Sequence, residues 1–139
     1  MSVIALRAYA KLVYFDLCLA RVSFEALCER VRNYPLGSRP PRAEIVAQIV
    51  VEQVWAEQIW AQEICAEMDM ACIWYPKEVL CLQRSAATAC LLKQYGVPAQ
   101  MVIGAQQMPF RSHAWVEVEG RVVNDKAYTP EMYPVLERY

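Results

Sequence analysis

The sequence has 139 residues, of which 57% are hydrophobic and 21% charged, and its formal net charge is −1. This composition excludes a disordered chain, and the length suits a single domain over residues 1–139 with a buried core. The near-neutral charge gives no indication of nucleic-acid binding, and the four glycines form neither of the glycine-rich phosphate-binding patterns.

The first 79 residues form a portion that we expect to be helical. Apolar spacing predicts a helix over 3–19, and Ser23 is the expected N-cap of a second helix that ends near Asn33. The stretch 33–42 contains three prolines and a glycine and is predicted to be a loop. A long helix follows over 43–70, in which Trp55 and Trp60 are core residues or, alternatively, a hydrophobic docking surface.

Residues 80–139 are expected to form a helix and a sheet. The stretch 81–96 predicts a helix that stops at Gly96, after a break at Pro76. A strand over 98–106 and a loop over 107–112 lead to a hairpin that begins at His113. The order predicts an α+β fold with a small antiparallel sheet and the 81–96 helix packed on it.

The cysteines and the targeting signals of the sequence indicate in which cellular compartment the protein is expected. Neither a signal peptide nor a membrane span is visible, so we expect a cytoplasmic protein with no membrane partner and with free thiols. No CxxC occurs and there is one histidine, so we expect no metal site, and nothing indicates a cofactor. Five cysteines lie in apolar helical settings and are expected to be small buried side chains: Cys18, Cys28, Cys65, Cys72 and Cys90.

The charges are distributed unevenly. Residues 1–42 carry seven Lys/Arg against three Asp/Glu, residues 43–79 carry one against seven, and residues 80–139 carry six against five. The basic and acidic parts are expected to pair internally or to remain solvated, and the alternative is a charged partner.

One cysteine stands apart from the others. Cys81 lies at the expected start of a helix, where free backbone N–H groups and the helix dipole favour a thiolate. His113 and Asp125 follow it in the order of a thiol acyl-transfer site, in which imidazole takes and returns the proton and the carboxylate orients the imidazole. A buried structural cysteine is the alternative for Cys81 taken alone.

The loop of the hairpin decides whether histidine and aspartate can meet. A two-residue Glu119–Gly120 turn would place His113 opposite Lys126, with Asp125 on the other face. A three-residue loop over 118–120, with Gly120 in the left-handed conformation, pairs residue 117 with residue 121 and places His113 opposite Asp125. A catalytic site therefore requires the bulged loop or an equivalent shift by one residue.

The stretches CLQRSAATACLLKQYGVPAQMVIG and HAWVEVEGRVVND resemble the transglutaminase-like leader peptidases of lasso peptide biosynthesis. The resemblance covers about residues 80–126. It implies a papain/transglutaminase-like fold, a Cys-His-Asp triad at Cys81, His113 and Asp125, and proteolytic removal of the leader from a lasso precursor. Because residues 1–79 are expected to be helical, the chain is similar to the split form of the family, which lacks the leader-recognition domain. The partners so implied are the precursor's leader, a separate leader-recognition protein and a lasso cyclase that acts downstream.

Two other functions remain open at this point, a non-catalytic adaptor of the same fold and amide transfer in place of hydrolysis. Three further residues are candidates for the site. Arg84 is expected to form a structural salt bridge, or else to contact substrate or partner. Trp115 shares the face of His113 and is expected to pack against the imidazole, with substrate contact as the alternative. The Cys81 N–H is one oxyanion donor by geometry, and Trp74 is a candidate for the second.

Overall fold

The computed structural model describes the backbone of residues 1–40 and 53–139 and the side chains of 1–40 and 57–139. Helices and strands are both present, so the expected α+β class is confirmed. The helices are α1 (Val3–Arg21), α2 (Phe24–Arg32), α4 (Gln53–Trp74), α5 (Cys81–Gln94) and the short α6 (Thr129–Met132). The strands are β1 (Ala99–Gln107), β2 (Phe110–Val118), β3 (Arg121–Val122) and β4 (Val135–Arg138).

Serine caps begin the first two helices. The Ser2 hydroxyl accepts from the Ala5 N–H, and the Ser23 hydroxyl accepts from the Ala26 N–H at 3.1 Å. The expected cap at Ser23 is therefore confirmed. The start of the long helix expected over 43–70 lies outside the described residues, and its described part, α4, ends at Trp74, before Pro76.

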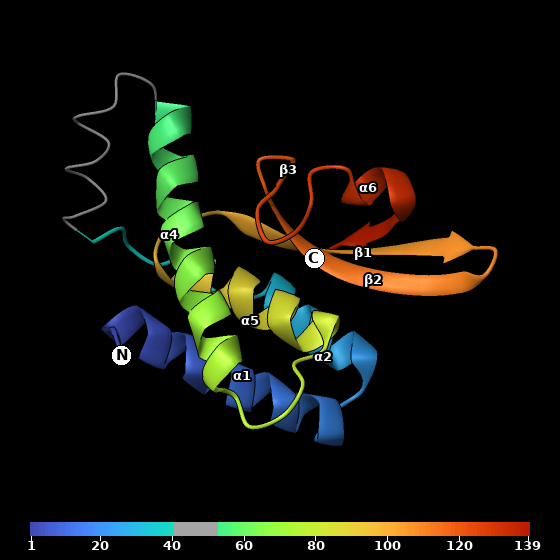
Figure 1. Ribbon diagram of the computed structural model, residues 1–139, viewed down its shortest axis with the longest axis horizontal. Coiled ribbons are helices and arrows are strands. Elements are labelled where there is room, and N and C mark those ends of the chain that lie inside the picture. The colour runs from blue at the N-terminus through green and yellow to red at the C-terminus, as the bar shows by residue number, and fades with distance from the viewer. Residues whose placement is uncertain (41–52) are drawn as a thin grey trace.

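The main core lies among α1, α4, α5 and the inner face of the sheet (Figure 1). Trp60 is 3% exposed, its indole N–H donates to the Tyr95 carbonyl at 3.3 Å, and its ring meets that of Tyr95 edge to face. The core alternative is thus confirmed for Trp60, whereas the Trp55 side chain lies outside the described residues. All six cysteines are free, and Cys18, Cys28, Cys65 and Cys90 are buried, while Cys72 is half-buried and Cys81 is exposed.

The sheet has four antiparallel strands in the order β3-β2-β1-β4. In Figure 1 α5 lies on one side of this sheet and α6 on the other, and the far end of the β1–β2 hairpin extends beyond the helices. Val116 and Val118 belong to the main core. Because side chains alternate along a strand, His113 and Trp115 project to the opposite face of β2.

The structure corrects two details of the expected hairpin. Strand β2 begins at Phe110, so His113 is not its first residue and the preceding loop is shorter than the expected 107–112. The prediction of a bulged three-residue loop is wrong, because Val118 pairs with Arg121 across a two-residue turn. Both turn residues, Glu119 and Gly120, have positive φ (51° and 76°), as a two-residue hairpin turn of type I′ requires. The positive φ of Gly120 is confirmed.

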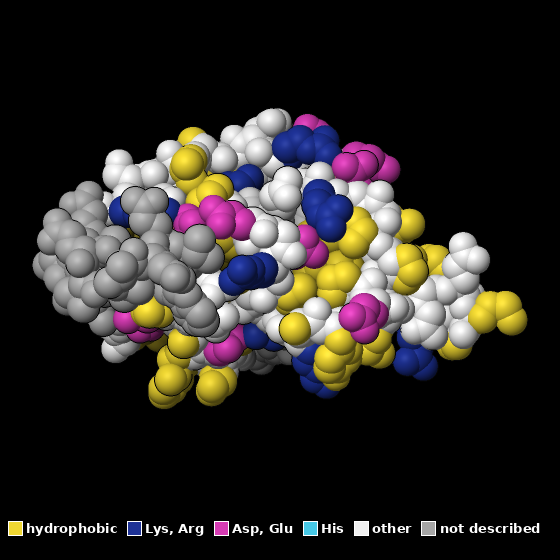
Figure 2. Space-filling model, turned by 90° about the horizontal axis from the view of Figure 1, so that it is seen from above, with side chains coloured by type: hydrophobic (Ala, Val, Ile, Leu, Met, Phe, Trp, Pro, Cys, Tyr) yellow, Lys and Arg dark blue, Asp and Glu magenta, His cyan; other side chains and the backbone are white. Residues whose placement is uncertain are grey.

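The surface mixes charge and hydrophobicity. The face shown in Figure 2 intersperses basic, acidic and hydrophobic side chains, and no histidine is visible on it. None of the described helices is long and apolar enough to cross a membrane.

Candidate active site

His113 and Asp125 are in direct contact despite the two-residue turn. The imidazole Nε2 lies 2.6 Å from Oδ2 of Asp125, and about a quarter of each side chain is exposed (26% and 28%). The second carboxylate oxygen, Oδ1, accepts from the backbone N–H of Lys126 at 2.8 Å. The carboxylate is thus anchored at both oxygens, and one of them aligns the imidazole.

The charge state of Asp125 determines which ring nitrogen of His113 carries the proton. Burial would raise the pKa of Asp125, but the hydrogen bonds from His113 and the Lys126 N–H, with the positive charge of Arg84 nearby, hold the pKa below its usual value. The carboxylate is therefore ionised at neutral pH and can only accept, so Nε2 carries the hydrogen. In the neutral imidazole Nδ1 is then the basic nitrogen.

The Asn124 side chain explains how Asp125 contacts His113. The register set by the two-residue turn would by itself place Asp125 on the opposite face of the hairpin. The β2–β3 ladder continues as far as the hydrogen bond from the Val123 N–H to the Val116 carbonyl. The return bond from the Val116 N–H goes to Oδ1 of the Asn124 side chain at 2.7 Å instead of to a backbone carbonyl. The Asn124 side chain therefore ends the ladder and frees the next residue to turn toward the imidazole.

A second contact of Asn124 connects this strand edge to helix α5. Its Nδ2 donates to Oγ of Ser85 at 3.4 Å, and Ser85 lies one turn after Cys81. Strand β3 pairs with β2 only at Glu117 and Val118, so none of the described strands covers the edge of β2 beside His113. The first turns of α5 and the Asn124–Asp125 segment meet at this edge.

Aromatic rings fix the imidazole from its other sides. The fully buried Trp115 ring lies nearly parallel to the His113 ring, with centroids 6.1 Å apart, and the Tyr133 ring lies at 5.1 Å. The Trp115 indole N–H donates to Oε2 of the buried Glu117 at 2.9 Å. A Cβ at Gly104, which pairs with His113 in the sheet, would come within 2.6 Å of the Trp115 ring and of the Tyr133 carbonyl oxygen. Glycine at this position allows the packing around the imidazole.

Cys81 is the first residue of α5 and is exposed. The preceding residue, Leu80, caps the helix without a side-chain hydrogen bond, so the first N–H groups of α5 keep their capacity to bind an anion. Among the described residues the Cys81 thiol makes no hydrogen bond, and the structure does not bring it into hydrogen-bond contact with His113. Contacts of this kind often tighten only when substrate binds.

The remaining candidates occupy different surroundings. Arg84 forms an ion pair with Asp69 of α4 and so connects α5 to α4. This contact is a structural salt bridge of the kind expected for Arg84. Trp115 is buried and packs beside the imidazole, which leaves it no surface for substrate. Trp74 is the last residue of α4 and is 65% exposed.

Sequence reasoning missed three residues of this site, Asn124, Tyr133 and Gly104. Asn124 is adjacent to Asp125, and a side chain that competes with backbone pairing is typical of asparagine, so residue type offered a signal. Tyr133 offered none, because only tertiary folding brings it to His113. Within the part of the chain that the structure describes, no group of three or more His, Cys, Asp or Glu side chains could hold a metal ion.

Comparison of the sequence with known proteins identifies its family. The chain belongs to the transglutaminase-like superfamily, whose family model matches residues 9–138. The expected transglutaminase-like fold is confirmed by this match together with the helices and the small antiparallel sheet. A curated relative is the microcin J25-processing protein McjB of Escherichia coli, which is 47% identical over 45 residues. The matched stretch covers 32% of this chain and only 22% of that protein. No solved structure matches the chain.

Proposed function

We propose that this chain is a cysteine peptidase that removes the leader peptide from a lasso peptide precursor. The observation that carries the proposal is the anchored pair of His113 and Asp125 at the strand edge where the helix that begins with Cys81 meets β2. The similarity to a microcin-processing protein and the family resemblance of residues 80–126 support the substrate class.

In the proposed reaction, Nδ1 of His113 takes the proton of the Cys81 thiol, and the thiolate attacks the carbonyl carbon of the scissile peptide bond. The Cys81 backbone N–H stabilises the resulting oxyanion, and Trp74 is a candidate for the second donor. The C–N bond breaks as the imidazolium returns the proton to the leaving amine. Water, deprotonated by the same imidazole, then hydrolyses the thioester and restores the thiol.

The charge on Asp125 supports its role in this scheme. A carboxylate that accepts from Nε2 holds Nδ1 in the unprotonated form needed at the start of the reaction, and it stabilises the imidazolium that forms. Asp125 orients the base and keeps its own charge throughout the cycle.

The proposal includes a separate leader-recognition protein that delivers the precursor in the cytoplasm, and a lasso cyclase that acts on the released core peptide. Delivery raises the effective concentration of substrate at Cys81, up to about the millimolar range for a short flexible connection, without changing the chemistry. We therefore expect weak cleavage by the chain alone and stronger cleavage when the leader-binding protein is added.

The test is mass spectrometry of a lasso precursor from the same producer, incubated with this chain alone and with the leader-binding protein titrated in. Hydrolysis gives separate leader and core, whereas amide transfer gives a ligated adduct when an amine is supplied. Cys81→Ala should abolish cleavage, and His113→Ala should cost as much because the two residues act as a unit. An inactive wild-type chain in the presence of its partner would identify it instead as a non-catalytic adaptor.

A further inference from the structure

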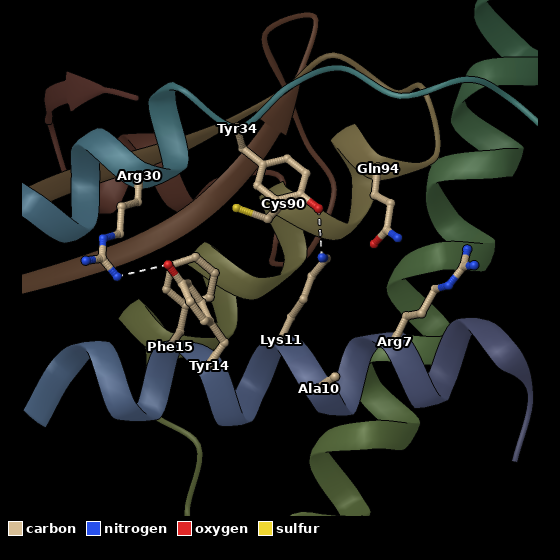
Figure 3. A pocket seen from close by; sticks show the side chains of 9 residues that line it. All are labelled: Arg7, Ala10, Lys11, Tyr14, Phe15, Arg30, Tyr34, Cys90 and Gln94. Atoms are coloured by element: carbon tan, nitrogen blue, oxygen red, sulfur yellow. Dashed lines mark hydrogen bonds between the residues drawn. The ribbon is translucent and has the colours of Figure 1, made fainter.

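A cavity of about 410 Å³ lies between α1, α2 and α5, away from the candidate active site. Figure 3 shows its lining side chains, of which Arg7 and Lys11 come from α1, Arg30 from α2, and Gln94 from the end of α5. Cys90, also in the lining, follows Cys81 by nine residues, which is about 13 Å along the helix axis. The size lies within the range of ligand-binding cavities.

The cations of this cavity pair with tyrosine hydroxyls, and none of the described carboxylates is their partner. Lys11 donates to the Tyr34 hydroxyl at 2.9 Å, Arg30 to the Tyr14 hydroxyl at 2.9 Å, and Arg7 to the Tyr95 hydroxyl at 2.9 Å. Within the described part of the chain none of the three forms an ion pair. None of the described residues that line the cavity carries a carboxylate, so its three positive charges are available to an anion.

Two other features of the cavity limit which class of anion it can bind. The lining includes the Tyr14 ring, which is 48% exposed and offers an apolar surface for carbon atoms. The side-chain oxygen of Gln94 is buried and accepts no hydrogen bond from any residue that the structure describes. An inorganic anion would use neither feature, and a small carboxylate without an N–H or O–H group, such as 3-phenylpropionate, would leave Gln94 without a donor. An acidic peptide segment supplies carboxylates, apolar side-chain carbon and backbone N–H groups together.

We propose that this cavity, lined by Arg7, Lys11, Arg30 and Gln94, is a docking site for an acidic segment of a partner protein. Recognition of acidic motifs by clusters of basic side chains is an established mode of peptide binding. The site is independent of the proposed peptidase reaction, because it needs neither Cys81 nor His113. Its cations account for three of the seven basic residues that make residues 1–42 positively charged.

The test is fluorescence anisotropy with a labelled acidic peptide, Asp-Glu-Phe-Asp-Glu, acetylated and amidated at its ends. The matched neutral peptide is Asn-Gln-Phe-Asn-Gln, and 3-phenylpropionate is the small-carboxylate competitor. We expect the acidic peptide to bind with Kd below about 1 mM, more weakly as salt is raised. Lys11→Gln and Arg30→Gln should each weaken binding by about tenfold, which corresponds to about 1.4 kcal/mol.

Arg21→Gln is the matched control, since Arg21 lies at the end of the same helix and does not line the cavity. Equal binding of the neutral peptide, absence of binding by the acidic one, or an equal loss in the Arg21 variant would overturn the proposal. Competition by phenylpropionate at the peptide's own affinity would also overturn it, because the cavity would then be a site for small carboxylates. Binding is measured without cleavage, so its failure is distinguishable from failure of the peptidase proposal.

Discussion

Replacement of Asn124 by alanine should damage both the fold and the site. The Val116 N–H, partly buried, would lose its acceptor at 2.7 Å, and an unsatisfied group of this kind costs about 1–3 kcal/mol. The longer bond to Ser85, at 3.4 Å, is weaker and adds less. We expect Asn124→Ala to lower the free energy of unfolding by about 2 kcal/mol, which for a chain of this size lowers Tm by roughly 5–10 °C.

The assay combines urea unfolding of Asn124→Ala with its peptidase activity. Because Asp125 would no longer be turned toward His113, activity should fall at temperatures where the variant is still folded, and kcat should fall more than KM rises. Ser85→Ala is the control, since it removes the longer bond and keeps the one to Val116, and it should cost under about 1 kcal/mol. Wild-type stability and activity in Asn124→Ala would refute the role assigned to this side chain.

Three other changes test the surroundings of the site and the core. Gly104→Ala should cost about 1–3 kcal/mol by overpacking and should shift the near-ultraviolet dichroism of Trp115, whereas an unperturbed spectrum would contradict the close approach. Glu117→Ala should lower the free energy of unfolding by about 1–3 kcal/mol because the buried indole N–H loses its acceptor, and urea unfolding measures the loss. Burial raises the pKa of Cys65 and of Cys90 to about 12, so the stability that these thiols contribute is complete below pH 9 and is lost as the pH rises toward 12. In reducing buffer the double Cys65→Ala/Cys90→Ala variant should lose stability less steeply over that window, and an unchanged slope would contradict this.

Local signals in the sequence predicted much of the helical structure. Ser23 predicted its helix start because a serine hydroxyl satisfies free N–H groups there, and Gly96 predicted a stop, where its φ is 80°. The position of Cys81 at a helix start followed from the break at Pro76 and the alanine-rich run after it. These signals depend only on neighbours in the chain.

The hairpin register could not be predicted in the same way. A bulged loop is required only if backbone pairing alone carries Asp125 to His113. The structure keeps the two-residue turn and obtains the shift from the Asn124 side chain, which replaces a backbone acceptor. Nor did the sequence assign an element to residues 127–139, which contain the short helix α6 and strand β4. Strand β4 completes the sheet, and the Tyr133 ring lies beside the imidazole. Such contacts depend on residues distant in sequence.

We propose that Cys81, His113 and Asp125 act as one unit, and the rate of Cys81 alkylation by iodoacetamide tests this without any substrate. The rate at pH 6 to 7, followed by peptide mass spectrometry, is compared between the wild-type chain and the His113→Ala and Asp125→Asn variants. We expect Cys81 to be alkylated before the other five thiols. In His113→Ala its alkylation should be slower by about tenfold or more, because the imidazole no longer stabilises the thiolate. The alkylation rate of Cys81 in Asp125→Asn should lie between the rates in the wild-type chain and in His113→Ala. An alkylation rate of Cys81 that is the same in the wild-type chain and in His113→Ala would contradict the triad.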